Sequence, residues 1–110
     1  MDRFWCVKRC LENNAALMSK DWQPDSRFLG NSSAPSRMVW VSHDLPSAAS
    51  RFVCEHEIYH LDDRCKWTPW REVKANAYAA AKHPVGAAQA AWMTVRSWER
   101  IKAVFLGGSD

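Results

Sequence analysis

Residues 54–63 read CEHEIYHLDD and place a glutamate beside the first of two histidines that are four positions apart. Four residues are slightly more than one helical turn, so His56 and His60 lie on one face if this stretch is a helix. Two neutral imidazoles in that arrangement can bind one metal ion, and Glu57 can reach a water molecule held there. The stretch therefore predicts a metal-binding helix, with zinc as the metal that this pattern favours.

The composition indicates one folded domain that covers residues 1–110. Of the 110 residues, 47% are hydrophobic and 25% are charged, and a chain of this length forms one hydrophobic core but not two. The net charge of +3 is spread along the chain without a run of Lys or Arg. Such a distribution permits nucleic-acid binding but gives little support for it.

No targeting signal is expected from this sequence. The first residues, MDRFWCVKRCLENN, do not contain the apolar segment of a signal peptide. No apolar run approaches the length that spans a membrane. We therefore expect a soluble, cytoplasmic protein with no membrane partner.

Four cysteines and seven tryptophans also bear on the core. In a reducing compartment, Cys6, Cys10, Cys54 and Cys65 are expected to remain thiols, and they favour core packing over a second zinc site because no CxxC pair accompanies them. The tryptophans are expected to fill the small core, since one indole covers a large area. An exposed subset that binds a partner is the alternative.

Hydrophobic periodicity predicts an α+β fold that is mainly helical. Residues 2–18 have the pattern of an amphipathic helix, with Asp2 as its N-cap. Residues 26–30 (SRFLG) and 37–42 (RMVWVS) are predicted strands of a small antiparallel hairpin, and residues 31–36 (NSSAPS) are its loop.

Three further helices are predicted after the hairpin. The first begins near Ser47 and carries the His-Glu-x-x-His motif. The second covers about 70–82, after Thr68 as N-cap and Pro69 in the first turn. The long C-terminal helix runs from about 85 to 105.

The C-terminal helix is apolar over most of its circumference. Two apolar sectors share it: Val85, Ala88, Trp92 and Val95 on one side, and Trp98, Ile101 and Phe105 on another. We expect both sectors to be core. A homodimer or partner surface on this helix is the alternative.

Zinc bound by two histidines needs a third protein ligand if water is to keep the fourth position. Asp63 follows His60 by three residues and is one candidate, although its short side chain points further along the helix axis. Glu72 is preferred, because the CKWTP turn sends the chain back and a ligand from a second helix closes a tetrahedron more easily. Asn76, one turn after Glu72, is expected to accept the outer N–H of a zinc histidine.

Two segments resemble the ImmA/IrrE-type minimal zinc metallopeptidases. Residues 51–60 (RFVCEHEIYH) are similar to their motif helix, in which Arg-Phe precedes His-Glu-x-x-His. Residues 72–81 (EVKANAYAAA), with HP shortly after, are similar to their second motif, which has a glutamate ligand and then Ala-Asn. The resemblance covers about residues 37–84.

This resemblance implies a minimal zincin-like fold and a gluzincin-like peptidase site. Zn²⁺ would be bound by His56, His60 and Glu72, and Glu57 would be the general base that takes a proton from water. The family also implies a specific protein substrate inside a bacterial or phage-infected cell. The strand at 37–42 could align an extended peptide substrate by edge pairing.

A peptidase also needs a donor for the tetrahedral oxyanion. Tyr78, His43 and His83 are candidates, and the sequence does not choose among them. Tyr59 is a weaker candidate, because its position turns it away from the histidines and towards the core.

Two non-enzymatic hypotheses compete with a peptidase. Zinc could staple the helices of a protein- or nucleic-acid-binding module, although a structural site has no need of Glu57 and more often closes with a fourth Cys or His. Alternatively, Arg96, Arg100 and Lys102 on the last helix could contact nucleic acid. The presence of Glu57 favours the peptidase.

Overall fold

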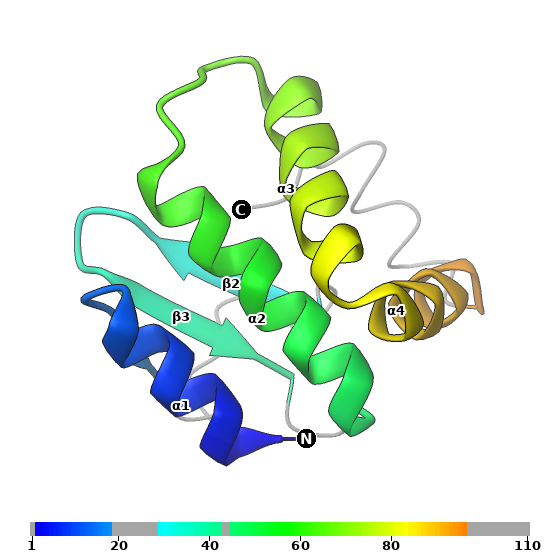
Figure 1. Cartoon of the computed structure of the whole chain (residues 1–110). Coiled ribbons are helices and arrows are strands. Elements are labelled where there is room, and N and C mark those ends of the chain that lie inside the picture. The colour runs from blue at the N-terminus through cyan, green and yellow to red at the C-terminus, as the bar shows by residue number, and fades with distance from the viewer. Residues whose placement is uncertain (1, 19–28, 43–44, 97–110) are drawn as a thin grey trace.

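The computed structural model describes residues 2–18, 29–42 and 45–96, which form four helices and three strands (Figure 1). In chain order the elements are α1 (Arg3–Glu12), β1 (Ala16–Leu17), β2 (Gly30–Ser33), β3 (Met38–Val41), α2 (Ser47–Asp62), α3 (Thr68–Lys82) and α4 (Pro84–Arg96). The predicted α+β, mainly helical class is confirmed.

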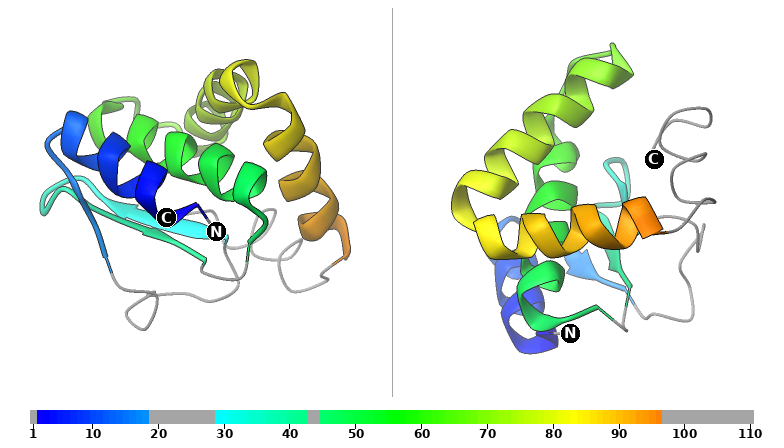
Figure 2. Two further views of the ribbon diagram at one scale, coloured as in Figure 1. Left: turned by 60° about the horizontal axis from the view of Figure 1, so that its bottom comes forward. Right: turned by 90° about the vertical axis from the view of Figure 1, so that its right-hand side faces the viewer.

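The three strands form one sheet with the order β1-β3-β2. β1 is parallel to β3, and β2 is antiparallel to β3. Helices α1 and α2 lie on one face of this sheet, and α3 and α4 extend beyond it on the far side of α2 (Figure 2). Helix α2 is therefore the central element, in contact with the sheet and with the other three helices.

The predicted hairpin is present, but its turn is shorter than expected. The prediction of a loop at 31–36 is wrong for residues 31–33, which belong to β2, and Ser33 pairs with Met38 of β3. Pro35 occupies the second position of a turn that the hydrogen bond from Arg37 N to the Ala34 carbonyl closes at 3.3 Å, and the fixed φ of proline suits that position. Of the predicted strand at 26–30, residues 26–28 lie outside the described residues.

The prediction of one helix over residues 2–18 is wrong beyond Glu12. Asn13 caps the C-terminus of α1, and Asn14 has a φ of 56°, a left-handed conformation that asparagine tolerates and that ends helices. The following Ala16 then pairs with Met38 in β1. At the other end, the predicted N-cap is confirmed, since the Asp2 side chain accepts a hydrogen bond from the backbone N–H of Trp5 at 3.1 Å.

The remaining helix boundaries are close to those predicted. Helix α2 begins at Ser47 as expected. Helix α3 has Pro69 in its first turn, but its N-cap residue is Trp67 rather than Thr68. Helix α4 is described as far as Arg96, and the predicted continuation to residue 105 lies outside the described residues. No helix in these ranges has the length and apolar character needed to cross a membrane.

Small residues let the helices approach α2 closely. A Cβ atom on Gly86 of α4 would lie 2.0 Å from the carbonyl oxygen of Ala48 and 2.9 Å from Cβ of Phe52. Similarly, α3 buries only Ala75 and Ala79. The backbones of α2 and α4 therefore lie close together at Gly86, and the residues that α3 buries are both alanines.

Most of the described tryptophans do not fill the core as predicted. Trp40 is buried and Trp5 packs at its edge, but Trp67, Trp70 and Trp92 are exposed. Trp22 and Trp98 lie outside the described residues. Three cysteines do meet the expectation, since Cys6, Cys10 and Cys54 are fully buried thiols, and Cys65 is half-buried.

The expectation that both apolar sectors of the C-terminal helix are core is also wrong for the first sector. Its members Val85, Ala88, Trp92 and Val95 are exposed, because α4 packs on α2 through Gly86 and Ala90 instead. Trp98, Ile101 and Phe105 lie outside the described residues. Arg100 and Lys102, two of the three residues of the proposed nucleic-acid surface, also lie outside the described residues. The third, Arg96, is described.

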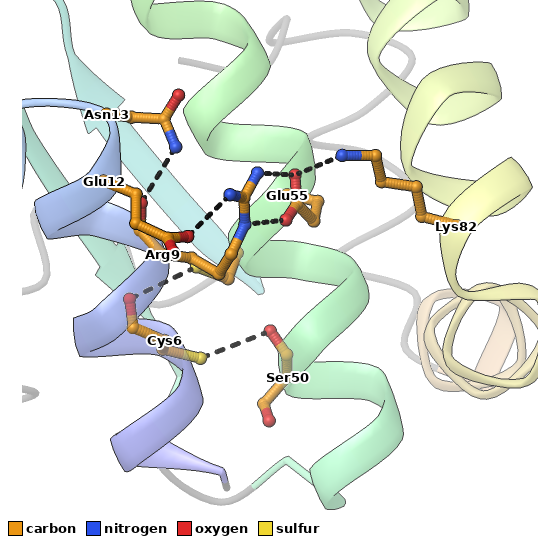
Figure 3. Close-up of polar contacts among 8 residues, drawn as sticks. Cys6, Arg9, Glu12, Asn13, Ser50, Glu55 and Lys82 are labelled. Atoms are coloured by element: carbon orange, nitrogen blue, oxygen red, sulfur yellow. Dashed lines mark hydrogen bonds and ion pairs between the residues drawn. The ribbon is translucent and has the colours of Figure 1, made fainter.

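A buried ion pair joins α1 to α2 (Figure 3). Glu55 is fully buried, and its carboxylate accepts hydrogen bonds from Nε of Arg9 at 2.5 Å and from Nη2 of the same residue at 3.3 Å. Lys82 of α3 brings its Nζ to 3.9 Å from Glu55. The bond to Glu55 raises the pKa of Arg9 above its ordinary value. This contact holds three helices together around one carboxylate.

Candidate metal centre

The two histidines and the glutamate of the predicted metal site come together between α2 and α3. His56 and His60 lie one turn apart on α2, and Glu72 lies on α3, one turn after it begins. Between the helices, residues 63–67 are extended and reverse the chain direction, so that α3 returns beside α2 (Figure 1). The predicted grouping of His56, His60 and Glu72 is confirmed.

The donor atoms of these three residues form a nearly equilateral triangle. Nε2 of His60 lies 3.0 Å from Nε2 of His56 and 3.0 Å from Oε2 of Glu72. The third side, from Nε2 of His56 to Oε2 of Glu72, measures 3.1 Å. His60 is buried, and the other two residues are half-buried.

Hydrogen bonds alone do not account for this triangle. A ring nitrogen either carries a hydrogen and donates it or carries a lone pair and accepts, but does not do both. Consequently, at most two of the three contacts can be ordinary hydrogen bonds, and the third brings two donors or two acceptors together. A cation bound by all three atoms removes the conflict, because each then directs a lone pair at the same positive charge.

The donor set fits zinc in both chemistry and size. Two imidazoles and one carboxylate form the ligand set of a catalytic zinc site, and donors 2.0–2.1 Å from a tetrahedral zinc are about 3.3 Å apart. The observed separations of 3.0–3.1 Å are slightly shorter, so the donors need to open by only a few tenths of an ångström. A fourth tetrahedral position remains free of these three ligands.

The electrostatics of Glu72 agree with a ligand role. Burial disfavours its charged form, but hydrogen bonds from His56 and His60 outweigh burial and lower the pKa of Glu72 to about 2. Glu72 is therefore a carboxylate at neutral pH, as a metal ligand must be.

Glu57 lies beside this triangle, on the side of α2 that faces the sheet. It is buried, and its Oε2 is 3.9 Å from Nε2 of His56. Strand β2 packs directly against it, since a Cβ atom on Gly30 would lie 3.2 Å from Cγ of Glu57. A carboxylate oxygen thus lies 3.9 Å from a ring nitrogen that could hold a metal.

The alternative ligand, Asp63, is engaged elsewhere. Its Oδ1 accepts hydrogen bonds from the backbone N–H of Cys65 and from Nζ of Lys74, both at 3.0 Å. The backbone bond from Cys65, together with Lys74, lowers the pKa of Asp63. Asp63 therefore caps the end of α2 and pairs with α3 rather than joining the metal-binding group.

Asn76 is exposed on α3 and makes no side-chain hydrogen bond within the described part of the chain. The predicted contact from its side chain to a histidine N–H is therefore not made. Asn76 faces solvent, whereas the buried residues of α3 are Ala75 and Ala79.

The candidate oxyanion donors do not meet at the triangle. Tyr78 stacks on Tyr59 with 5.1 Å between ring centroids, and these rings line a surface cavity of about 450 Å³ whose lining includes none of the three metal-binding residues. Tyr59 is accordingly half-buried at this cavity rather than directed into the core.

His83 lies at the opposite end of α3 from Glu72. Its ring packs edge-on against Trp5 with centroids 5.1 Å apart. Burial lowers the pKa of His83, while nearby Glu55 acts in the opposite direction. The remaining candidate, His43, lies outside the described residues.

Two residues of the centre were not singled out by sequence reasoning. Phe52 contacts the ring of His56 with centroids 6.3 Å apart, and its spacing of four residues before His56 was the available signal. Gly30 provides the close approach of β2 to Glu57. No local pattern marks Gly30, because its role depends on a strand and a helix that are far apart in sequence.

Comparison with known proteins adds no relative. The chain matches no protein-family model, and searches of curated proteins and of solved structures find nothing similar. The function must therefore be inferred from the site itself.

Proposed function

We propose that this chain is a zinc-dependent peptidase, with Zn²⁺ held by His56, His60 and Glu72 and with Glu57 as the general base. One observation carries the proposal: three ligand atoms lie 3.0–3.1 Å apart, and a buried carboxylate stands 3.9 Å from one of them. This combination supplies both a metal site and a proton acceptor beside it.

The chain's own groups have distinct roles in this hydrolysis. When bound, zinc supplies Lewis acidity, which favours deprotonation of water and polarises a scissile carbonyl. The Glu57 carboxylate accepts the proton from the attacking water and returns it to the leaving amine. Phe52 packs beside the ring of His56 and limits its movement, so that less reorganisation is needed at this ligand.

Cysteine placement supports a catalytic site over a closed structural one. Structural zinc sites usually have four protein ligands. Cys54 is fully buried and directs its Sγ to the Cys6 carbonyl at 3.9 Å, and Cys65 directs its Sγ to the Trp67 carbonyl at 3.9 Å. Among the described residues, the metal-binding group therefore has three members.

For the substrate, we propose an extended peptide that pairs with β2. The expectation that the strand at 37–42 offers the pairing edge is wrong, because β3 is the middle strand, between β1 and β2. Strand β2 is an edge of the described sheet and contacts α2 near Glu57. An edge strand can bind a peptide through main-chain hydrogen bonds. The resemblance of residues 51–60 and 72–84 to ImmA/IrrE-type peptidases supports a specific protein target in a bacterial or phage-infected cytoplasm.

The test combines metal analysis with digestion of an unbiased peptide library by the wild type and by Glu57→Gln. We expect one zinc per chain in both proteins. Cleavage by the variant should fall by about 10²–10⁴-fold, the usual contribution of a general base. Equal cleavage by the two proteins would remove Glu57 from the mechanism.

A non-catalytic, zinc-stapled binding module is the second candidate. It is favoured by the weak packing of α3, which buries only Ala75 and Ala79 and would be held to α2 by the metal. In that case both proteins bind one zinc, neither cleaves any peptide, and metal removal lowers the melting temperature of both equally.

A further inference from the structure

Helix α4 carries an exposed apolar stripe, formed by Val85, Ala88, Trp92 and Val95. The exposed fractions of Val85, Trp92 and Val95 are 64%, 62% and 64%. Successive members are three, four and three residues apart, which is the spacing of the contact seam between two helices in a coiled coil. A side chain at each of these positions faces the same side of α4.

The opposite face of α4 already has a partner. Gly86 and Ala90 are buried against α2, and Met93 packs at the edge of the core. From Pro84 to Val95 the helix has no charged residue. A solvent-facing helix surface normally carries charges, so the composition of α4 is that of a helix with apolar neighbours on two sides.

We propose that the α4 stripe is a homodimer interface, in which α4 of a second copy packs antiparallel across a two-fold axis near Ala90. The sequence of the stripe is suited to this orientation. Antiparallel pairing places Val85 opposite Val95 of the second copy and Ala88 opposite its Trp92. Each large indole then meets a small side chain, whereas parallel pairing would set indole against indole and leave a gap at Ala88.

The size of the stripe indicates a weak dimer. At these exposed fractions, one tryptophan, two valines and one alanine offer about 400 Å² per copy. Two copies can therefore bury at most about 800 Å², which is below the standard size of a stable interface and fits only a weak, transient association. The inference is independent of the proposed peptidase activity, because the stripe and the metal-binding group share no residue.

Sedimentation of the full chain over a wide concentration range tests the proposal. We expect the average mass to rise from 12.6 kDa towards twice that value as concentration increases. Trp92→Ala should weaken the dimer by at least about tenfold, since it removes a central aromatic anchor. The matched control is Trp70→Ala, which removes a tryptophan that is 47% exposed on α3 and should leave association unchanged.

A size-swap variant distinguishes the antiparallel dimer from other contacts. Ala88→Trp alone should abolish association, because it opposes two indoles. The double variant Ala88→Trp/Trp92→Ala should restore association, because each large side chain at position 88 then meets a small one at position 92 of the other copy. Circular dichroism confirms that each variant is folded. A wild-type chain that stays monomeric at all concentrations, or equal dissociation of the Trp70 and Trp92 variants, would overturn the proposal, as would a failure of the double variant to recover.

Discussion

Glu55 and Glu57 are two residues apart on α2, and both are buried, yet their surroundings differ in kind. Glu55 faces α1, where Arg9 binds both carboxylate oxygens and Lys82 adds a second positive charge (Figure 3). Glu57 faces β2 and the metal-binding nitrogens, with His56 Nε2 at 3.9 Å. The first carboxylate is bound by cationic side chains of two other helices, and the second lies beside a ring nitrogen of the candidate metal site.

If the proposed function is right, one helix carries a carboxylate for stability and another for chemistry. A buried carboxylate with a full set of charged hydrogen-bond partners is costly to disturb and has nothing left to bind. A carboxylate next to a set of metal donors can change its proton content during a reaction. Substitutions at the two positions should therefore have opposite consequences for folding and for activity.

The largest effect is expected from Glu72→Ala, which removes the metal donor from α3. Zinc affinity should fall by about a thousandfold or more, since only two ligands from one helix turn remain. Isothermal titration calorimetry with zinc measures this loss of affinity. The matched control is Asp63→Ala, because Asp63 is bonded to Lys74 and Cys65 instead. Zinc retained by the Glu72 variant and lost by the Asp63 variant would show that the third ligand is Asp63.

Glu55→Gln should have the next largest effect, this time on folding. The substitution leaves the guanidinium of Arg9, of which 24% is exposed, without its buried counter-charge, and we expect a loss of about 2–4 kcal/mol in the free energy of unfolding. Urea denaturation measures this loss. Glu12→Gln removes the exposed partner of Arg9 and should cost no more than about 1 kcal/mol.

Urea denaturation of Glu57→Gln tests whether the two carboxylates contribute differently to stability. The variant's free energy of unfolding should stay within about 1 kcal/mol of the wild type, because glutamine has the size of glutamate and can still form hydrogen bonds, whereas the proposed peptidase activity should be lost. A Glu57 variant as unstable as the Glu55 variant would mean that the two carboxylates do not differ in role.

Gly30→Ala should cost about 1–3 kcal/mol in stability by overpacking. The added Cβ would lie 2.5 Å from Cγ1 of Val53 and 3.2 Å from Cγ of Glu57. Val53→Ala in the same chain removes the closer clash, so the double variant should recover part of the stability lost to overpacking. No recovery would indicate that β2 does not pack against α2 as closely as described.

The smallest effect concerns the pH dependence of stability near Glu55. Burial holds the pKa of His83 in the folded chain below its usual value of 6.5. Between the folded pKa and 6.5, the unfolded chain therefore binds more protons than the folded chain. The stability that the neutral His83 ring contributes is therefore fully present above pH 6.5 and is lost as the pH falls through the lower pKa of the folded state. Melting temperatures of the wild type and of His83→Phe between pH 5 and 8 should converge or cross on the acid side. A constant difference would contradict the lowered pKa.

Local sequence signals were sufficient for the metal-binding group. The spacing of His56 and His60, and the proline that starts the next helix, determine how α2 and α3 present their side chains. The role of Glu72 followed from the short reversal between these helices. Asn76, one turn after Glu72, was expected to contact a histidine, but it is exposed and α3 buries Ala75 and Ala79 instead.

Features that depend on distant segments were not predictable in this way. Strand β1 has two residues and exists because β3 pairs with them. The Arg9–Glu55 pair requires α1 to dock on α2, which no local pattern encodes. The exposure of Trp67, Trp70 and Trp92 depends on which face of each helix packs on the rest of the chain, and α3 and α4 bury glycine and alanine instead.

The unequal burial of the two metal-binding helices has a consequence for kinetics. Helix α2 buries ten residues and α3 buries two, so amide hydrogens of α2 should exchange with deuterium only through global unfolding, and those of α3 through local opening. Transient detachment of α3 would withdraw Glu72 while His56 and His60 stay in place. We therefore expect the rate of zinc release to follow the opening rate of α3 rather than the unfolding rate of the whole chain.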